Sequence, residues 1–369
     1  MTVTPGNHLT YAAAGVDVDA GDRAVGLMKT WVAKTHGPEM LGGIGGFAGL
    51  YDVHRLTAYQ HPVLATSTDG VGTKVAIAQQ MDVHDTIGFD LVGMVVDDIV
   101  VCGAEPLFMT DYIACGRVVP ERIAAIVKGI AEACVVAGCA LAGGETAEHP
   151  GLLAPDEYDV AGAATGVVEH DRMLGPARVR AGDVVVAIAS SGLHSNGYSL
   201  VRRVIGDAGW ALDRDVPELG RTLGEELLTP TRVYAADVLD LVGSALDVRA
   251  LSHVTGGGLA ANLARVLPAG LRADVERGTW SPAPIFGLVG ALGRVSHADL
   301  ERTFNMGVGM LAIVPPESVD AAVARLQSRD LAAWPCGEVR PDDGTAQPDE
   351  SRGAKGVDGG AAALVGTYR

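Results

Sequence analysis

The sequence has few basic residues and no long uninterrupted apolar run. Lys and Arg number 28 against 45 Asp and Glu, which gives a net charge of −17. Nucleic acids and anionic membrane surfaces are bound mainly through clustered Lys and Arg, so we expect neither as a partner. The most hydrophobic segment is interrupted by Asp97 and Asp98. It therefore falls short of the roughly 20 apolar residues needed to span a bilayer.

The sequence also lacks paired cysteines and a secretory pattern. The number of cysteines is odd, none belongs to a Cys-x-x-Cys motif, and most lie within apolar segments; they are Cys102, Cys115, Cys134, Cys139 and Cys336. We expect reduced, buried thiols, since disulfides are characteristic of oxidising compartments. No basic stretch followed by an apolar one occurs near the first residue. These features predict a cytoplasmic protein.

The abundant residue types indicate an α/β enzyme. Hydrophobic residues make up 48% of the chain but aromatic residues only 5%, and there are 49 glycines. The core is therefore expected to consist mainly of Ala, Val, Leu and Ile, with many tight turns between elements. The length of 369 residues exceeds the roughly 250 to 300 residues that one core usually organises. We predict two domains, each with an α/β arrangement.

Strand and helix patterns alternate along the first half. Apolar, β-branched runs predict strands, and a helix is expected from Pro120 to Ala137, with proline near its first turn and Gly138 just past its end. The segment from Glu169 to Gly182 is polar and rich in turn residues. We place the domain boundary there, giving domains 1–170 and 171–369. The predicted strands are 61–67, 106–114, 139–142 and 159–168, the third of them broken by Gly143 and Gly144.

The second half repeats the pattern. Residues 341–360 contain many Asp, Gly, Pro and Ser residues and few apolar ones, so we expect a flexible surface segment there. The predicted strands are 184–189, 307–314 and 332–340. One predicted helix begins near Asn196, and three others cover 230–243, 257–267 and 316–328.

The first candidate for ligand binding is a glycine-rich segment formed by Gly42, Gly43, Gly45 and Gly46. Such a segment lets backbone amides approach an anion closely. It lacks the Lys-Ser/Thr ending of a Walker loop and the strand-to-helix frame of a GxGxxG loop. On its own it indicates a flexible loop more strongly than a phosphate site.

Residues 66–74 (TSTDGVGTK) give a stronger signal. They place a carboxylate, two turn glycines, several hydroxyls and a lysine at the end of a predicted strand. Carboxylate oxygens suit Mg²⁺, which is often shared with nucleotide phosphates, and a lysine can neutralise a phosphate oxygen. We expect nucleotide binding here, against the alternative of a polar hairpin with a solvated lysine. The residues concerned are Asp69, Gly70, Gly72, Thr73 and Lys74.

Acidic side chains occur in two further places. Asp97 and Asp98 lie within the apolar stretch 92–106, and buried carboxylates are costly unless they are paired, hydrogen-bonded or metal-bound. Glu145 and Glu148 follow a predicted strand, where magnesium could collect ligands from separate segments. A helix N-cap or a buried, hydrogen-bonded carboxylate is the alternative for the Asp pair, Glu148 fits a surface position, and for Glu145 the two interpretations are balanced.

Two polar segments of the second half could bind a phosphorylated substrate. Residues 190–198 (SSGLHSNGY) are dense in hydroxyl, imidazole and amide groups, and 252–258 (SHVTGGG) lead directly into a predicted helix. Glycine amides at a helix start favour a phosphate. A flexible cap is the alternative for the glycines, a capping or structural histidine is the alternative for His194, and His253 is expected to be a core histidine. The predicted substrate residues are Thr255, Gly256, Gly257 and Gly258, with His194, Ser195 and Asn196 on the neighbouring wall.

The ordered blocks of the chain resemble one family. They are AGVDVDAG at 14–21, the glycines at 42–46, TDGVGTK at 68–74, HDTIGFDLVGM at 84–94, GAEPLF at 103–108, GGETAE at 143–148, SSGLHSNGYSLVR at 190–202, LLTPTR at 227–232, TGGG at 255–258 and TFNMGVGM at 303–310. Together they resemble the phosphoribosylformylglycinamidine cyclo-ligases, also called aminoimidazole ribonucleotide synthetases. Three departures are visible: Ala12 where the family commonly has lysine, Asp97 where it commonly has asparagine, and a longer C-terminal extension.

The resemblance implies a fold and a reaction. Each domain would pack helices on a mixed sheet, and the N-terminal domains of two subunits would join in a homodimer that completes the ATP sites. The reaction implied is ATP-dependent closure of formylglycinamidine ribonucleotide to aminoimidazole ribonucleotide, with Mg²⁺ as the metal. On this basis we expect Asp69, Asp98 and Glu145 to bind the metal, and Lys74, Asp98 and His194 to be catalytic.

Two other interpretations remain at the level of sequence. The amidine-forming synthetase one step earlier in the pathway shares the glycine and DGVGTK blocks, but is usually larger or multi-subunit and requires ammonia. A non-catalytic nucleotide-binding module that regulates partner assembly belongs to a different class. Substrate-dependent ATPase activity would separate the enzyme from the module.

Overall fold

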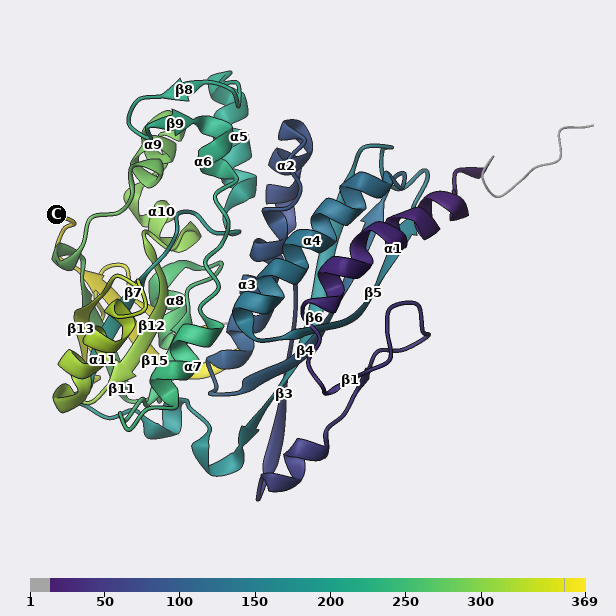
Figure 1. Ribbon diagram of the computed structural model, residues 1–369. Coiled ribbons are helices and arrows are strands. Elements are labelled where there is room, and N and C mark those ends of the chain that lie inside the picture. The colour runs from purple at the N-terminus through teal and green to yellow at the C-terminus, as the bar shows by residue number, and fades with distance from the viewer. Residues whose placement is uncertain (1–13, 355) are drawn as a thin grey trace, which may run out of the picture.

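Two mixed β-sheets, each packed by helices, form the two halves of the molecule (Figure 1). The structure is a computed structural model that describes residues 14–354 and 356–369. The departure at Ala12 lies outside the described residues. The predicted α/β class with two helix-packed mixed sheets is confirmed. No helix of the described residues is both long and apolar enough to cross a membrane.

The first sheet has four strands in the order β3-β6-β4-β5. Neighbours are antiparallel except β4 and β5, which run parallel, so α4 connects that pair as a crossover. The predicted strands 61–67, 106–114 and 159–168 are confirmed with small shifts in their ends. The bounds are β3 Pro62–Gly70, β4 Glu105–Cys115, β5 Ala140–Glu148 and β6 Tyr158–Glu169.

Strand β5 differs from the prediction, because Gly143 and Gly144 do not end it. A Cβ on Gly144 would lie 1.7 Å from the carboxylate of Asp111 on β4, so Gly144 makes room for a neighbouring side chain inside a continuous strand. Asp69 and Gly70 likewise belong to β3 and not to a turn after it.

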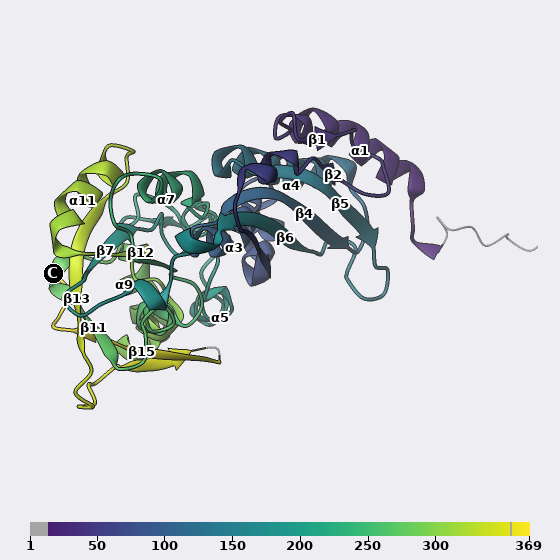
Figure 2. The same cartoon turned by 90° about the horizontal axis from the view of Figure 1, so that it is seen from below.

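The α-helices of this half, among the described residues, are α1 Val18–Ala33, α2 Val75–Met81, α3 Ile87–Val100 and α4 Pro120–Ala137. Helix α4 has the predicted bounds, with Pro120 at its first turn and Gly138 in the left-handed conformation at its end. All of α3 except Phe89 and Asp98 is buried, because it packs on the sheet and on the second half. Helices α1 and α4 lie together over one face of the sheet (Figure 2).

The opposite face of this sheet carries a row of exposed side chains. Thr68, Ala163 and Thr110 are aligned across β3, β6 and β4, and all three are exposed. Leu64 on β3 and Tyr112 on β4 are 63% and 41% exposed. A sheet face that exposes apolar side chains is a candidate for contact with another protein surface.

The second sheet has seven strands in the order β10-β12-β7-β13-β11-β15-β14. The predicted strand 184–189 is confirmed, and 307–314 and 332–340 are confirmed with ends shifted by one residue. The bounds are β7 Val184–Ala189, β10 Ala250–His253, β11 Leu271–Glu276, β12 Val308–Val314, β13 Ala333–Pro341, β14 Ser351–Ala354 and β15 Val357–Val365.

The helices of the second half are α5 Tyr198–Ala208, α6 Leu223–Leu227, α7 Ala235–Val242, α8 Gly258–Ala264, α9 Pro284–Gly293, α10 His297–Thr303 and α11 Val319–Gln327. Short two-stranded ribbons are formed by β1 Met40–Leu41 with β2 Leu50–Tyr51, and by β8 Asp215–Val216 with β9 Arg221–Thr222. The expected helices at 230–243, 257–267 and 316–328 are present but shorter.

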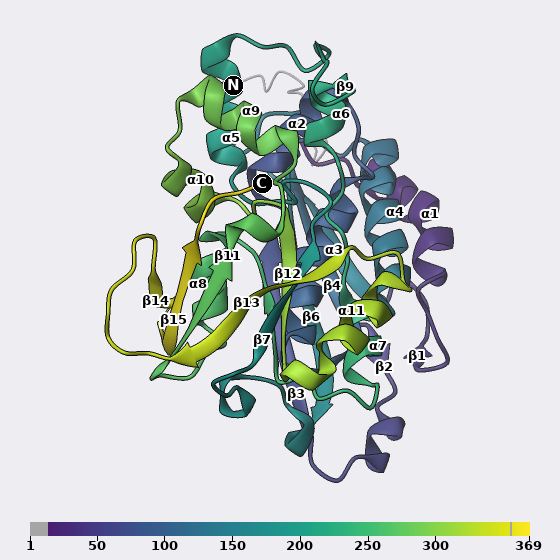
Figure 3. The same ribbon diagram turned by 90° about the vertical axis from the view of Figure 1, so that its left-hand side faces the viewer.

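The segment 341–360 differs from the flexible stretch we expected. Strand β14 and the first four residues of β15 lie within it, at one edge of the second sheet (Figure 3). Buried Arg272 reaches the irregular stretch before β14, donating to the carbonyl of Thr345 at 2.9 Å and pairing with Glu350 at 3.5 Å. Composition alone gave no sign of this, because small residues such as Gly and Ala can still pair as a strand when a neighbouring strand is present.

Candidate active site

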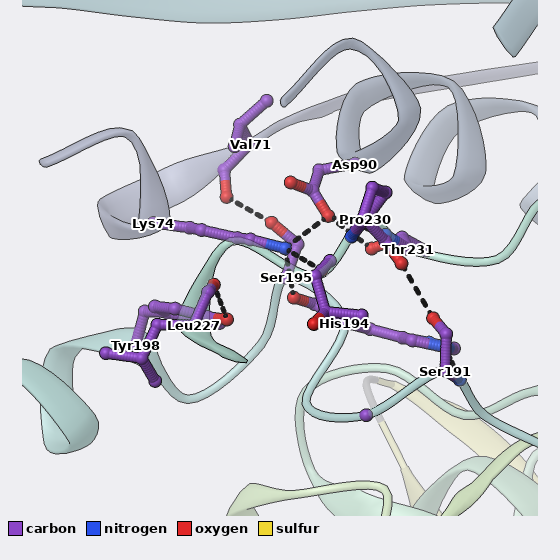
Figure 4. A network of polar contacts seen from close by, with 12 residues as sticks. Val71, Lys74, Asp90, Ser191, His194, Ser195, Tyr198, Leu227, Pro230 and Thr231 are labelled. Atoms are coloured by element: carbon purple, nitrogen blue, oxygen red, sulfur yellow. Dashed lines mark hydrogen bonds and ion pairs between the residues drawn. The ribbon is translucent and has the colours of Figure 1, made fainter. Parts of the chain in front are cut away.

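Lys74 lies where the two halves meet, in a single helical turn directly after β3. Its side chain is fully buried. Nζ donates to Asp90 Oδ1 at 2.7 Å, to the His194 carbonyl at 3.0 Å and to the Thr229 carbonyl at 2.7 Å (Figure 4). An ammonium group has three protons, and here the protein uses all of them. This geometry does not match the expected contact between Lys74 and a phosphate oxygen.

Asp90, on α3, is the partner that sequence reasoning missed. Its Oδ1 also accepts from the backbone N–H and the hydroxyl of Thr231, at 2.9 and 2.6 Å. Burial raises the pKa of Asp90 and lowers the pKa of Lys74, while their mutual attraction opposes both shifts. Asp90 is the second of the two acidic residues in HDTIGFDLVGM, and only its position inside an apolar helix could have drawn attention to it.

A second polar connection joins α3 to the end of β10. Nδ1 of His253 lies 2.9 Å from Asp98 Oδ1. His253 is buried in the core, as expected, but it is also bonded to a predicted site residue. Burial disfavours a charged His253, but the hydrogen bond to Asp98 and the nearby carboxylates of Asp97 and Asp69 together raise its pKa. Asp69 therefore lies near the Asp98–His253 pair.

Asp97 lies inside α3 and is a buried, hydrogen-bonded carboxylate, which is one of the two alternatives to a metal role. Both of its oxygens accept from the backbone N–H of Tyr234 at 3.0 Å, at the start of α7. Burial raises the pKa of Asp97 to about 7. The structure gives Asp97 a structural role, holding α7 against α3.

His194 is held in an unusual backbone conformation, with φ of 60°, which few residues other than glycine adopt. Its Nε2 accepts a hydrogen bond from the N–H of Ser191 at 3.1 Å. The neutral ring must therefore carry its proton on Nδ1, and this buried atom has no hydrogen-bond partner among the described residues. Burial, and then the charges of His253 and Lys74, lower the pKa of His194 well below its usual value. His194 can thus offer one neutral N–H donor.

The side chains of Ser195 and Asn196 make contacts within the protein. The Ser195 hydroxyl donates to the carbonyl of Val71 at 2.7 Å, which ties the loop to the end of β3. The Asn196 amide lies 3.5 Å from the sulfur of Met94, and a Cβ on Gly256 would lie 3.3 Å from its Oδ1. Asn196 and Gly256 are therefore neighbours, as the predicted substrate wall requires.

The segment Thr255–Gly258 precedes α8, which is only seven residues long. Gly257 and Gly258 have φ of 106° and 77°, and a Cβ on Gly258 would lie 1.7 Å from the carbonyl of Glu301. The buried side chain of Asn262 donates to the carbonyls of Thr255 and Gly258, at 3.1 and 2.8 Å. Because α8 is short, its dipole contributes little, and the glycine amides are the donors available to an anion.

The glycine-rich segment Gly42–Gly46 lines a different place, a cavity of about 780 Å³. The cavity lies between α1, the β1–β2 connection and β5, and Asp111 and Glu145 also line it. Burial raises the pKa of Asp111 to about 7. Among the described residues that line this cavity, the titratable side chains other than His36 are all acidic; the acidic ones are Asp17, Asp22, Asp111, Glu145 and Glu148. Lys74 and Asp69 are not among its lining residues.

Within one chain, the three expected magnesium ligands do not lie together. Asp69 is on β3 and Glu145 is on β5, with β6 and β4 between these strands, whereas Asp98 is on α3. Among the residues that the structure describes, no group of three or more His, Cys, Asp or Glu side chains could hold a metal ion. Glu148 accepts backbone N–H bonds from Asp17 and Val118, both at 2.6 Å, and so serves a structural role.

Other residues of the TDGVGTK block also lie near the place where the two halves of the chain meet. Asp69 is exposed and accepts from the N–H of Gly70 at 2.8 Å. Gly72 has φ of 72°, which a residue with a side chain would adopt only with strain. The Thr73 hydroxyl lies 3.2 Å from that of Ser199, at the start of α5. Within one chain, this block therefore meets the His194 loop (residues 190–196) and not the glycine-rich cavity.

Comparison with known proteins identifies relatives over nearly the whole chain. Residues 50–168 match the AIR synthase related protein N-terminal domain, and residues 180–347 match the corresponding C-terminal domain. A phosphoribosylformylglycinamidine cyclo-ligase of Geobacillus kaustophilus is 52% identical over 330 residues, which cover 89% of this chain and 95% of that protein. One from a Geobacillus species is 49% identical over 337 residues, covering 91% of this chain and 97% of that protein.

Solved structures show the same fold at lower identity. The thiamine-monophosphate kinase of Stenotrophomonas maltophilia superimposes with a TM-score of 0.62 at 20% identity, covering 93% of this chain and 97% of that one. At this identity the likeness establishes the arrangement of helices and sheets and nothing about ligands.

Proposed function

This chain belongs to the phosphoribosylformylglycinamidine cyclo-ligase family, and on that premise we propose that it converts formylglycinamidine ribonucleotide and ATP to 5-aminoimidazole ribonucleotide, ADP and phosphate. The observation that carries the proposal is 52% identity extending over 89% of the chain and 95% of a cyclo-ligase. The amidine-forming alternative has no comparable support.

The reaction explains why the site offers positioned donors and no obvious nucleophile. Transfer of the γ-phosphoryl group to the amide oxygen makes that oxygen a good leaving group. The amidine nitrogen then attacks the carbon that bears this oxygen and forms a C–N bond. The C–O bond breaks, phosphate leaves with the oxygen, and the attacking nitrogen loses a proton. Catalysis of this kind depends on positioning and charge stabilisation. The neutral Nδ1–H of His194, which has no protein partner in the described chain, would donate to a substrate oxygen.

The substrate ribose phosphate is proposed to bind at Thr255–Gly258, with Asn196 beside it. Support comes from the closeness of Gly256 to Asn196 and from the backbone amides that glycines leave accessible. The net charge of −17 requires local donors of this kind for an anionic ligand.

ATP is the proposed co-substrate, with Mg²⁺ bound alongside it. The acidic lining of the glycine-rich cavity would repel a triphosphate unless a cation accompanied it. Magnesium is usually held by one or two carboxylates together with phosphate oxygens. Asp69 and Asp98, both near His253, have suitable oxygens for this ion, which would supply charge neutralisation at the phosphates.

A homodimer with composite ATP sites is also proposed. The glycine-rich cavity and the TDGVGTK block lie apart in one chain, although the resemblance assigns both to ATP. Pairing of two chains through the exposed face of the first sheet, around Thr68, Ala163 and Thr110, would cover its apolar side chains and allow one chain to supply Glu145 to the other's site. The five free thiols support the proposed cytoplasmic location.

The function is tested with the purified full-length chain. Incubation with formylglycinamidine ribonucleotide, ATP and Mg²⁺ is expected to yield aminoimidazole ribonucleotide and ADP in equal amounts, measured by chromatography. ATP binding without ribonucleotide-dependent ADP release would instead identify a regulatory module and contradict the proposal.

A further inference from the structure

We propose that Lys74 and Asp90 are positioning residues: their buried ion pair fixes the His194 loop (residues 190–196) against the segment 229–232, and so sets the substrate-binding wall. The inference rests on the proposed function, because the wall is defined by that substrate. It assigns Lys74 a role different from the phosphate contact that its sequence block suggests.

The position of Lys74 at the meeting point of three segments is the first argument. One proton of its ammonium group goes to Asp90 on α3, and the other two go to backbone carbonyls of the second half, at His194 and Thr229. The side chain has no exposed surface. A phosphate contact would require breaking at least one of these bonds and would bring a second anion to a group already paired.

The bond to the His194 carbonyl acts at a strained point of the chain. His194 has φ of 60°, a conformation that persists in non-glycine residues only when its surroundings hold it. The Lys74 ammonium supplies a charged donor to that same residue at 3.0 Å. Holding this peptide fixes the direction of the imidazole, whose Nδ1–H is proposed to reach the substrate.

Asp90 extends the same restraint to the segment 229–232. Its Oδ1 holds both the N–H and the hydroxyl of Thr231, while the Ser191 hydroxyl donates to the carbonyl of Pro230 at 2.7 Å and accepts from the N–H of Arg232 at 3.1 Å. The two segments are thus joined to each other and to α3 (Figure 4). Other direct bonds bridge them, but Lys74–Asp90 is the buried charged pair at their centre.

Removing one partner leaves the other as an isolated buried charge, which is far more damaging than removing both. A double-mutant cycle therefore tests the pair. The variants are Lys74→Met, Asp90→Asn and the combined Lys74→Met/Asp90→Asn. The control cycle uses Lys128→Met and Asp85→Asn, which break an ion pair of 3.0 Å whose side chains are 31% and 43% exposed.

Each single substitution is expected to lower kcat/KM for the ribonucleotide about 100-fold, as displacement of binding groups does, with KM for ATP changed less than about threefold. The double variant is expected to be at least as active as the better single variant, and the control cycle to stay near wild type. A Lys74→Met variant that raises mainly KM for ATP, while Asp90→Asn does not, would overturn the proposal in favour of a phosphate contact.

The His194 imidazole provides a readout independent of turnover. With ¹³C-labelled histidine, the Cε1 signal of His194 is expected to shift in both single variants of the pair but not in the control variants. An unmoved signal in folded Asp90→Asn protein refutes the positioning role, even if Lys74→Met does not fold. If the wild-type chain fails to close the ring, the proposed function fails, while this signal still decides whether the pair orients His194.

Discussion

His253 Nδ1 and Asp98 Oδ1 lie 2.9 Å apart, joining the end of β10 to helix α3 across the two halves of the chain. The other ring nitrogen, Nε2, is buried and has no hydrogen-bond partner among the described residues. Asp98 thus bonds to a second-half residue while its side chain remains 37% exposed. A change at Asp98 is therefore expected to affect charge at the site more than the fold.

Asp98→Asn is expected to reduce turnover by about 100-fold or more, while the melting temperature stays within about 4 °C of wild type. The amide oxygen can still accept from His253, so the contact survives and the negative charge is lost. Steady-state rates at limiting and saturating Mg²⁺ measure the effect. Near-normal activity at limiting Mg²⁺ would exclude a metal role, and exposed Asp156→Asn serves as the control.

Gly256→Ala is expected to raise KM for the ribonucleotide at least about tenfold and to leave KM for ATP nearly unchanged. The new Cβ would lie 3.3 Å from Asn196 Oδ1 and would obstruct the proposed phosphate site. Gly257 is less suitable for this test, because its φ of 106° means that any side chain strains the backbone as well. Equal increases in the two KM values would argue against the site.

The substitutions His194→Asn and His194→Ala distinguish a contact between His194 and the substrate from a purely structural role. Asparagine tolerates the left-handed conformation better than alanine, so the Asn variant should be the more stable of the two. Both are expected to lose about 100-fold in kcat if the Nδ1–H contacts substrate. Wild-type kinetics combined with a lowered melting temperature would show that His194 is only structural.

Asp111→Asn is expected to remove a pH dependence of stability. Burial raises the pKa of Asp111 from 3.8 to about 7, so the folded chain binds this proton more tightly than the unfolded chain does. The linked stability is complete below 3.8 and is lost as the pH rises through about 7. The melting temperature of the variant relative to wild type should therefore rise by about 2–4 °C between about pH 5 and about pH 8. A melting-temperature difference that does not change with pH, like that expected for exposed Asp159→Asn, would contradict this prediction.

Ala163→Arg tests the proposed dimer. A long charged side chain in the centre of the exposed row on the first sheet should block a self-complementary contact. Sedimentation is expected to show a dimer for wild type and a monomer for the variant, with ATP-dependent turnover reduced at least about tenfold. The control Ser328→Arg, at an exposed residue just after α11, should leave both unchanged. A fully active wild-type monomer would refute the composite site.

The sequence by itself determined the local elements and the family. Helix α4 begins at Pro120 and ends before Gly138 because both signals act within one turn of the helix ends. Strand β7 has the predicted bounds because a continuous apolar run fits a fully packed strand. The ordered motifs were sufficient to indicate the cyclo-ligase family.

Only the tertiary structure decided how the site residues are used. It paired Lys74 with Asp90 and placed Asp69 and Glu145 on strands separated by two others. It also continued β5 through Gly143 and Gly144 and ordered the segment after β13. Each of these outcomes depends on a partner far away in the chain. A lysine at a strand end is equally compatible with solvent, phosphate or a buried carboxylate, and packing of the two halves brings the carboxylate to it.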